Sequence, residues 1–420
     1  MSKTQISNLC ERRHLLPERI KKTAEDISVR VEREGDKALF DLTAEIDGVK
    51  LKTLAVNAEE FKAARTKVPE NLKKAIKTAA RNIEIFHKTQ IPAKAAPVQT
   101  SKGVKCWRRF TPLETAGIYV PGGSAPLFST ALMLALPAKI AGCKNIILCT
   151  PPAKDGGVTP EILYAAELCG VSRVFKAGGA QAIFAMAYGT ESIPRVDKIF
   201  GPGNQYVTAA KMMASSSVAI DMPAGPSEAL IIADGSTDPV FAASDILSQA
   251  EHGPDSQSVL VSASAEKTRL ILKEVSRMLN KLPRKDIAAA ALKNSFAVNV
   301  KNIKEALAFS NAYAPEHLIL NIKNWWEAAE RVVNAGSVFC GPLSAEPLGD
   351  YASGTNHTLP TAGFARAFGG VNVQSFGKWI TYQTATAEGL KTLGGAVMLM
   401  AEAEGLRAHA NAIKIRRGAQ

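Results

Sequence analysis

Apolar side chains recur every three to four positions from Pro17 to about Ile91, which is the spacing of one buried helix face. A proline opens this stretch, and Gly35, Gly48 and Pro69 interrupt it. The pattern predicts a helical N-terminal region made of several segments.

Short strand-like runs alternate with helical runs between about residues 115 and 222. This alternation is typical of βαβ units around a parallel sheet, so we expect one α/β domain here. The strand-like runs are GIYV, NIILCT, RVFKAG, DKIFG and VAIDM, and the helical runs between them include STALMLALPAKIAG, PEILYAAELCG, AQAIFAMAYG and NQYVTAAKMMAS.

The same alternation restarts after PAGPSE and predicts a second α/β unit, with strands at ALIIAD, SVLVSAS, FAVNV, LILNI and SVFCGP. From Leu343 to about Trp379 the chain is rich in Gly, Pro, Ser and Thr, as loops are. A helical segment then runs to the end, and it reads as an appended tail.

Length and composition describe a globular protein: 420 residues, of which 46% are hydrophobic, can bury a large core. No apolar stretch has the length of a secretory signal or a membrane span, which predicts a cytoplasmic protein without membrane contact. The net charge of +12 comes mostly from residues 1–110, which hold 24 Lys and Arg against 14 Asp and Glu. These charges are spread over amphipathic segments without interleaved aromatics, so we expect solvated helix faces and no nucleic-acid site.

Six cysteines are scattered along the chain and form no C-x-x-C pair. A cysteine nucleophile is a common route for oxidising an aldehyde, so each is a candidate. However, Cys143 and Cys149 flank the apolar run NIIL and Cys169 ends an apolar helix. We therefore expect reduced core thiols.

Three glycine-rich turns each follow a strand-like run and precede a helix: PGG (121–123), AGGA (177–180) and GPGN (201–204). At such turns in doubly wound sheets, helix N-terminal N–H groups can meet phosphates. No complete G-x-G-x-x-G and no G-x-x-x-x-G-K-[ST] occurs. The turns therefore allow nucleotide binding but do not require it.

Gln249 and His252 in ILSQAEHGPDSQ are three positions apart near a predicted helix end. That spacing places an amide oxygen and an imidazole on one helix face, where both can bind one metal ion. Asp350 in PLGDYASGTNHTLP lies in a predicted loop that also contains His357, and a carboxylate there could complete a zinc site. Surface residues without function are the alternative in both cases.

Glu316 and His317 follow Pro315 in AYAPEHLIL, at the predicted entry to a strand. An adjacent acid and base suit proton transfer, but adjacent strand residues point to opposite faces unless the chain bends here. Glu404 and His409 are five apart, so they share no helix face unless the helix ends between them. These residues alone favour an α/β metalloenzyme over a binding module and leave its reaction open.

At these residues the sequence closely resembles histidinol dehydrogenases. The resemblance runs in register over roughly residues 15–417, through GIYVPGGSAPLFSTALMLALPAKIAG, AGGAQAIFAMAYGTESIPRVDKIFGPGNQYVTAAK, VAIDMPAGPSE, SQAEHGPDSQ, NAYAPEHL, LGDYASGTNHTLPT and EGLRAHANAIKIR. It implies two incomplete Rossmann-like parallel-sheet domains, a helical N-terminal region, and a C-terminal tail exchanged across a homodimer. The implied bounds are 1–111 for the N-terminal region, packed on the second α/β domain; 112–225 for an NAD-binding domain; 226–370 for a domain with the zinc and substrate site; and 371–420 for the tail.

The resemblance also implies roles for individual residues. Gln249, His252 and Asp350 would hold one zinc ion per subunit, together with His409 from the partner subunit. Glu316 and His317 would be the acid–base pair. Tyr119, Gln181 and Asn204 would hold NAD, and the substrate would contact the zinc ligands, His317, Ser227 and Glu404.

The implied reaction oxidises L-histidinol to L-histidine with two NAD molecules through an enzyme-held aldehyde, the last steps of histidine biosynthesis. In it His317 takes the alcohol proton and Glu316 activates water. The alternative is a paralogous zinc-dependent NAD dehydrogenase of another polar alcohol, such as a sulfonated diol. Because Glu404 and His409 are both present, the first activity is favoured.

Overall fold

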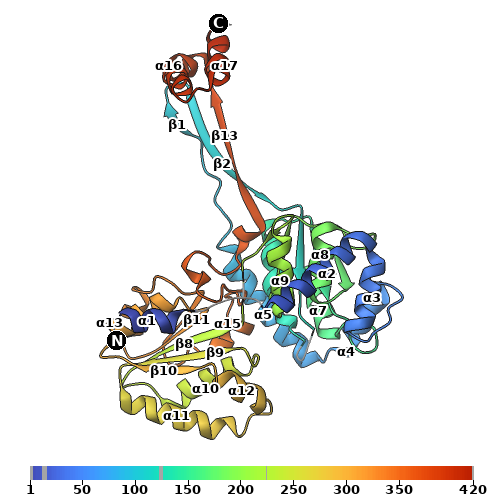
Figure 1. The fold of residues 1–420 in the computed structure, drawn as a ribbon, viewed down its shortest axis with the longest axis vertical. Coiled ribbons are helices and arrows are strands. Elements are labelled where there is room, and N and C mark those ends of the chain that lie inside the picture. The colour runs from blue at the N-terminus through green and yellow to red at the C-terminus, as the bar shows by residue number, and fades with distance from the viewer. Residues whose placement is uncertain (1–2, 12–16, 123–125, 224, 419–420) are drawn as a thin grey trace. The chain divides into compact units, whose positions relative to one another are not determined.

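The computed structural model describes residues 3–11, 17–122, 126–223 and 225–418 (Figure 1). Contacts divide the chain into two units. The first unit comprises Met1–Gln90 and Glu114–Phe376, and the second comprises Ile91–Leu113 and Gly377–Gln420. Both predicted α/β domains belong to the first unit. In the described residues, no helix is both long enough and apolar enough to cross a membrane.

The N-terminal region is helical, as predicted, but its packing differs from the expectation. α2 contacts α8 and α9, α4 contacts α7, and α5 contacts α6, so these helices cover the first α/β domain; α1 contacts α13 of the second. The reason is the apolar face of α2 and α3, where Ile27, Val31 and Leu39 share a core with Ile183 and Phe184 of α8. The helices are α1 (Lys3–Cys10), α2 (Glu18–Glu34), α3 (Asp36–Ile46), α4 (Ala58–Lys67) and α5 (Glu70–Lys88).

The first α/β domain is a parallel sheet in the order β5-β4-β3-β6-β7. Because helices cover both of its faces, its central strands are buried after their first residue. The order reverses between β3 and β6, which makes their carboxyl ends the edge where ligands bind in such sheets. The elements are β3 (Thr115–Tyr119), α6 (Phe128–Ala141), β4 (Asn145–Thr150), α7 (Pro160–Cys169), β5 (Arg173–Lys176), α8 (Gly179–Tyr188), β6 (Lys198–Phe200), α9 (Gln205–Ala214) and β7 (Ala219–Ile220).

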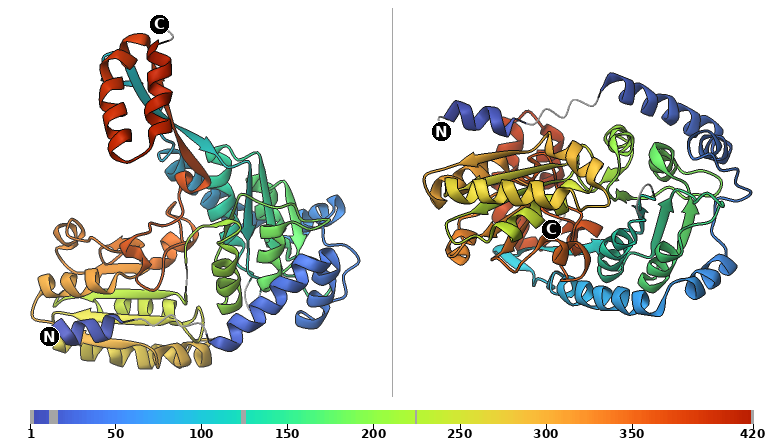
Figure 2. Two further views of the ribbon diagram at one scale, coloured as in Figure 1. Left: turned by 45° about the horizontal axis from the view of Figure 1, so that its top comes forward. Right: turned by 90° about the horizontal axis from the view of Figure 1, so that it is seen from below.

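The second α/β domain repeats this arrangement in the order β10-β9-β8-β11-β12, also parallel. α10 and α11 pack on one face of the sheet and α13 and α14 on the other (Figure 2). The two Rossmann-like sheets predicted from the sequence are thus confirmed. The elements are β8 (Glu228–Ala233), α10 (Pro239–Ala250), β9 (Gln257–Ser262), α11 (Ala265–Leu279), α12 (Lys285–Leu292), β10 (Phe296–Asn299), α13 (Ile303–Tyr313), β11 (His317–Asn321), α14 (Trp325–Ala329), β12 (Ser337–Cys340), α15 (Glu346–Tyr351), η1 (Phe364–Arg366) and η2 (Val373–Phe376).

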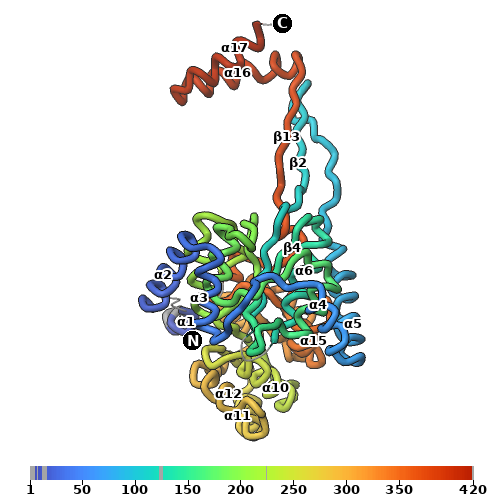
Figure 3. The backbone as a smooth tube through the Cα atoms, turned by 90° about the vertical axis from the view of Figure 1, so that its right-hand side faces the viewer, coloured from blue at the N-terminus to red at the C-terminus, as the bar shows by residue number. Residues whose placement is uncertain are grey.

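The second unit contains an antiparallel sheet that the sequence analysis missed. Its order is β1-β2-β13, and β2 and β13 run side by side (Figure 3). Aromatic pairs fix their register: Trp107 stacks on Tyr382 at 5.4 Å between ring centroids, and Phe110 meets Trp379 at 5.7 Å. The elements are β1 (Val98–Ser101), β2 (Val104–Pro112), β13 (Gly377–Ala385), α16 (Ala387–Ala403) and α17 (Arg407–Gly418).

Candidate active site

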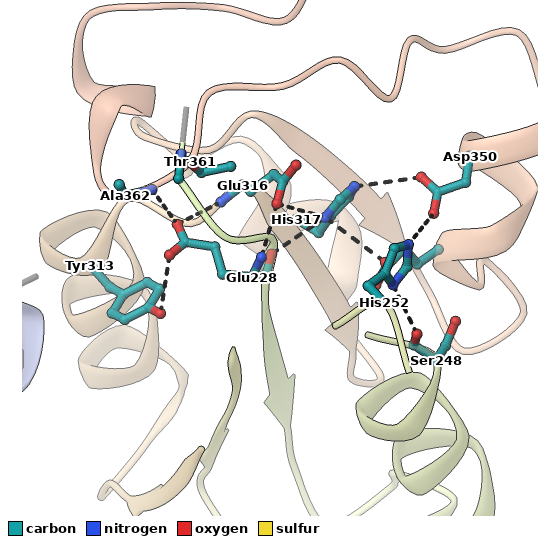
Figure 4. A network of polar contacts seen from close by, with 11 residues as sticks. Glu228, Ser248, His252, Tyr313, Glu316, His317, Asp350, Thr361 and Ala362 are labelled. Carbon is teal, nitrogen blue, oxygen red and sulfur yellow. Dashed lines mark hydrogen bonds and ion pairs between the residues drawn. The ribbon is translucent and has the colours of Figure 1, made fainter. Parts of the chain in front are cut away.

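Glu316 and His317 meet at the amino end of β11, where the chain bends sharply. Ala314 ends α13 in the left-handed region, with φ of 53°, and Pro315 then carries the chain into the strand. Glu316 stands just before the strand and His317 begins it, and Glu316 Oε2 lies 3.7 Å from His317 Nδ1 (Figure 4). The bend that the sequence analysis required for a shared pocket is therefore present.

His317 is buried among carboxylates. Its Nδ1 lies 3.9 Å from Glu346 Oε1, and its Nε2 lies 3.5 Å from Asp350 Oδ1. Burial opposes the charged imidazolium, but the negative charges of Glu346, Glu316 and Asp350 outweigh burial and raise the pKa of His317 to about 10. Burial also raises the pKa of Glu316 to about 8, against the opposing charge of His317. Strongly shifted groups in one buried cluster are characteristic of catalytic sites.

A set of metal-ligating groups lies beside this pair, at the end of α10 and on α15. Ligand atoms of His252, Glu346 and Asp350 all lie within 4.8 Å of one another. Gln249 in the last turn of α10 is fully buried, and neither its Oε1 nor its Nε2 has a hydrogen-bond partner in the described structure. The same holds for both carboxylate oxygens of the fully buried Glu346. Buried polar atoms without a hydrogen bond are costly, so the oxygen atoms of Gln249 and Glu346 fit a bound cation.

Asp350 lies on the short helix α15 and not in the predicted loop. Its Oδ2 is 4.0 Å from His252 Nε2, so the structure brings these two predicted ligands together. His357 belongs to the same segment. Its Nδ1 lies 2.9 Å from the Asp350 carbonyl oxygen and its Nε2 lies 3.3 Å from Thr130 Oγ1, so it anchors the end of α15 to α6.

The three residues expected to hold NAD lie at the carboxyl edge of the first sheet. Tyr119 ends β3, and its hydroxyl accepts the Gly179 N–H at 3.0 Å at the start of α8. Gln181, also in the first turn of α8, is buried with both amide atoms unpaired among the described residues. Asn204 caps α9 by accepting the N–H groups of its first turn. The N-terminus of α9 therefore lies where the strand order reverses, and the Tyr119 hydroxyl joins the N-terminus of α8 to the end of β3.

A buried ion pair holds the turn after β6. Lys211 Nζ pairs with Asp221 and donates to the Gly201 carbonyl oxygen at 2.9 Å, while Asp221 Oδ2 accepts the Gly201 N–H at 2.9 Å. Gly201 has φ of 128°, and a Cβ there would stand 2.1 Å from the Tyr119 carbonyl oxygen. Only glycine lets the turn approach β3 this closely.

The remaining predicted site residues are Ser227, Glu404 and His409. Ser227 is half-buried just before β8, and its carbonyl oxygen accepts the Gln257 N–H at 3.1 Å. Glu404 caps the C-terminus of α16 and His409 lies on α17, both exposed within the second unit. The helix does end between them, which is the condition the sequence analysis set for the two residues to work together.

The sequence matches the histidinol dehydrogenase family over residues 10–417. The chain belongs to the histidinol dehydrogenase family. It is 54% identical over 416 residues to a histidinol dehydrogenase of Bacteroides thetaiotaomicron, covering 99% of this chain and 97% of that protein. It is 52% identical over 391 residues to one from Xylella fastidiosa, covering 93% and 90%. The crystal structure of histidinol dehydrogenase from Elizabethkingia anophelis superposes with a TM-score of 0.96 at 49% identity, covering 100% of this chain and 97% of that one.

Two buried glutamates near the candidate site, Glu346 and Glu228, were not predicted from the sequence. Glu346 stands four residues before Asp350 in EPLGD, a spacing that places two carboxylates on one helix face and could have revealed it. Glu228 ends the motif PAGPSE next to Ser227, but no local pattern distinguishes it from a surface glutamate. Only the pairing of β8 with β11 brings it to Glu316 and His317.

Two of the six cysteines belong to the buried core, as the sequence predicted. Cys149 and Cys169 are both fully buried. Burial raises the pKa of the Cys149 thiol far above its usual range and that of Cys169 to about 12. Neither can supply a thiolate nucleophile at neutral pH.

Proposed function

We propose that this chain oxidises L-histidinol to L-histidine, consuming two NAD+ and one water and releasing two NADH and three protons. The observation that supports this most strongly is the buried Glu316–His317 pair, held against a carboxylate-rich cluster in a chain of the histidinol dehydrogenase family. The thiols of Cys149 and Cys169 are too deeply buried to attack an aldehyde. The Glu316–His317 pair supports an acid–base route through water instead of one through either of these thiols.

His317 acts as the base toward the substrate hydroxyl. A cation that offsets the surrounding carboxylate charge would lower the raised pKa of His317 and favour its neutral ring. Because Nδ1 faces the Glu228 carbonyl oxygen at 3.3 Å, a neutral imidazole that donates there presents Nε2 as the proton acceptor. Glu316 serves the second oxidation. Its Oε2 accepts the Glu228 N–H, which orients the carboxylate, and its raised pKa lets it take a proton from water as the aldehyde is hydrated.

When bound, NAD would supply the hydride acceptor for each oxidation. Tyr119, Gln181 and Asn204 are the residues that would hold it, at the two helix N-termini described above. We assign nucleotide binding to residues 112–225 and substrate binding to residues 226–370. The unpaired amide of Gln181 is the feature that best fits a polar ligand there.

Gln249, His252 and Asp350 are the residues that would hold zinc, and Ser227 is proposed to contact the substrate. When bound, the cation would help to orient the substrate and would offset the carboxylate charges around His317. The exposed Glu404 and His409 on the tail are proposed to enter the site of a second copy of the chain, so that residues 371–420 complete it in a homodimer.

The decisive experiment is the count of NADH formed per L-histidinol consumed by the purified, zinc-loaded protein. A ratio of two supports oxidation to the carboxylate. A ratio of one would leave a simple alcohol dehydrogenase. No NADH from L-histidinol, but NADH from a sulfonated diol, would assign the chain to the paralogous activity. Zinc content measured before and after chelation separates loss of metal from loss of fold.

A further inference from the structure

Two non-glycine residues of the described chain have a positive φ, and both lie beside the proposed catalytic pair. Ala314 has φ of 53° and Ala362 has φ of 63°. For residues with a Cβ this conformation is disfavoured and persists only where surrounding contacts impose it. Ala314 produces the bend that brings Glu316 and His317 together, so whatever imposes the bend also arranges the pair.

One carboxylate reaches both strained segments. Glu228, only 4% exposed at the start of β8, accepts the Ala362 N–H at 3.1 Å and the Glu316 N–H at 3.3 Å, both through Oε1. Its Oε2 lies 3.5 Å from the Tyr313 hydroxyl, in the last turn of α13 before the bend (Figure 4). Charge-assisted bonds of this kind stabilise a buried carboxylate and hold the donors in place.

The main chain of Glu228 also contacts the pair, and here it contacts the side chains of Glu316 and His317. Its N–H donates to Glu316 Oε2 at 2.9 Å, and its carbonyl oxygen lies 3.3 Å from His317 Nδ1. The side chain of Glu228 therefore fixes where the Glu316 backbone lies, while its backbone fixes where the Glu316 carboxylate and the His317 ring point.

We propose that Glu228 is a positioning residue, whose carboxylate holds the strained Ala314 and Ala362 segments so that Glu316 and His317 face one pocket. This inference rests on the proposed function, because the roles of Glu316 and His317 do. The contacts of Glu228 described above are with the protein, at Glu316, His317, Tyr313 and Ala362. Displacements of about 1 Å in a catalytic group can cost on the order of a hundredfold in rate, so loss of this contact should act on turnover.

Three substitutions of Glu228 test whether it positions the catalytic pair or only stabilises the fold. Glu228→Gln keeps an acceptor oxygen for both N–H groups, so kcat should stay within about fivefold of wild type. Glu228→Leu removes the acceptor and should lower kcat by about 30-fold or more, with KM for L-histidinol and bound zinc within about twofold. Glu228→Asp shortens the side chain by one methylene and tests the same contact should the leucine variant not fold; kcat should fall by about tenfold.

Asp36 supplies a matched control. Its carboxylate likewise accepts a main-chain N–H, from Ser192 at 3.2 Å, and a hydroxyl, from Thr190 at 2.6 Å, but it holds a turn after α8. Asp36→Leu should lower thermal stability and leave kcat within about twofold, because it touches no proposed catalytic group.

A double-mutant cycle with Glu316→Gln gives the sharpest readout. If Glu228 acts through Glu316, the loss of kcat from Glu228→Leu should be at least about fivefold smaller in the Glu316→Gln background. Independent, multiplicative losses would overturn the proposal, as would a leucine variant with wild-type kcat or with lost zinc. If wild-type protein yields no NADH from L-histidinol, the proposed function fails instead, and the two failures are distinct.

Discussion

The Glu316 carboxylate lies 3.7 Å from Nδ1 of His317, although neighbouring residues of a regular strand point to opposite faces. The left-handed Ala314 lets both side chains converge, because Glu316 precedes β11 and only His317 belongs to it. This convergence places an acid and a base in one buried space.

Replacing the base should abolish most turnover and spare binding. We expect His317→Asn to lower kcat by about 10²–10⁴-fold, the usual contribution of a positioned general base, with KM for L-histidinol within severalfold. Steady-state kinetics on zinc-loaded protein measures both. His87→Asn is the matched control, since His87 is a buried histidine that bonds to its own helix at Ile83, and its kcat should stay within about twofold. Unchanged kcat in the His317 variant would remove it from the mechanism.

The close approach of Gly201 to β3 predicts a position that tolerates no side chain. A Cβ there would meet the Tyr119 carbonyl oxygen at 2.1 Å, and its φ of 128° is strained for any other residue. Gly201→Ala should therefore displace the turn and weaken NAD binding at least about tenfold, measured by titration calorimetry. Gly235→Ala, where a new Cβ meets nothing within 4 Å, should bind NAD normally. Equal NAD affinity in both variants would contradict this account of the turn.

Replacing Gln249 should affect the stability of the metal-free protein and its zinc affinity in opposite directions. Both of its amide atoms are buried without a hydrogen bond among the described residues, so the metal-free fold gains nothing from them. Gln249→Leu, which has similar volume, should keep or raise the melting temperature of the metal-free protein and weaken zinc binding at least about tenfold. Competition with a chromogenic chelator measures the affinity. A lower melting temperature with unchanged zinc affinity would make Gln249 a structural residue.

His87 should make stability depend on pH. Burial lowers its pKa below the ordinary 6.5, so the folded protein favours the neutral ring. The unfolded chain therefore binds a proton more readily, and the stability that the neutral ring contributes is full above about pH 6.5 and is lost as the pH falls through the lower folded pKa. Between pH 8 and 5, the melting temperature of wild type should fall relative to that of His87→Leu, which has no ring to protonate. A constant difference would show that His87 does not titrate in this range.

The two α/β domains could be predicted from the sequence because each strand and helix carries its own local pattern, as in NIILCT followed by PEILYAAELC. The sheet of β1, β2 and β13 could not be. Trp107 and Tyr382 stack across strands that are far apart in the chain, and neither strand alternates clearly between buried and exposed residues.

Some residues of the candidate site could likewise be predicted from local spacing, and others could not. Gln249 and His252 share a helix end, so their spacing alone suggested a common ligand. Glu228 reaches Glu316 only because β8 pairs with β11 in the register that sets His317 against Ala229. Contacts of that kind are set by tertiary pairing, and no local sequence pattern contains them.

The proposed exchange of the C-terminal tail can be tested by mixing two inactive variants. His317→Asn impairs the site of its own chain, whereas His409→Asn would impair the site of the other copy. If sites are shared, a heterodimer of the two variants contains one site with both defects and one site with neither. Random reassociation of equal amounts makes about half of the dimers mixed, so the mixture should recover about a quarter of wild-type kcat.

Reassociation after mild denaturation, followed by NADH formation, measures this recovery. His409→Asn mixed with Gln249→Leu should recover similarly, because Gln249 belongs to the same site as His317. A mixture of His317→Asn with Gln249→Leu should recover nothing, since both defects then leave every site damaged. Activity that stays at the level of the separate variants in all three mixtures would mean that His409 serves its own chain, and the zinc site would have to be completed within one subunit.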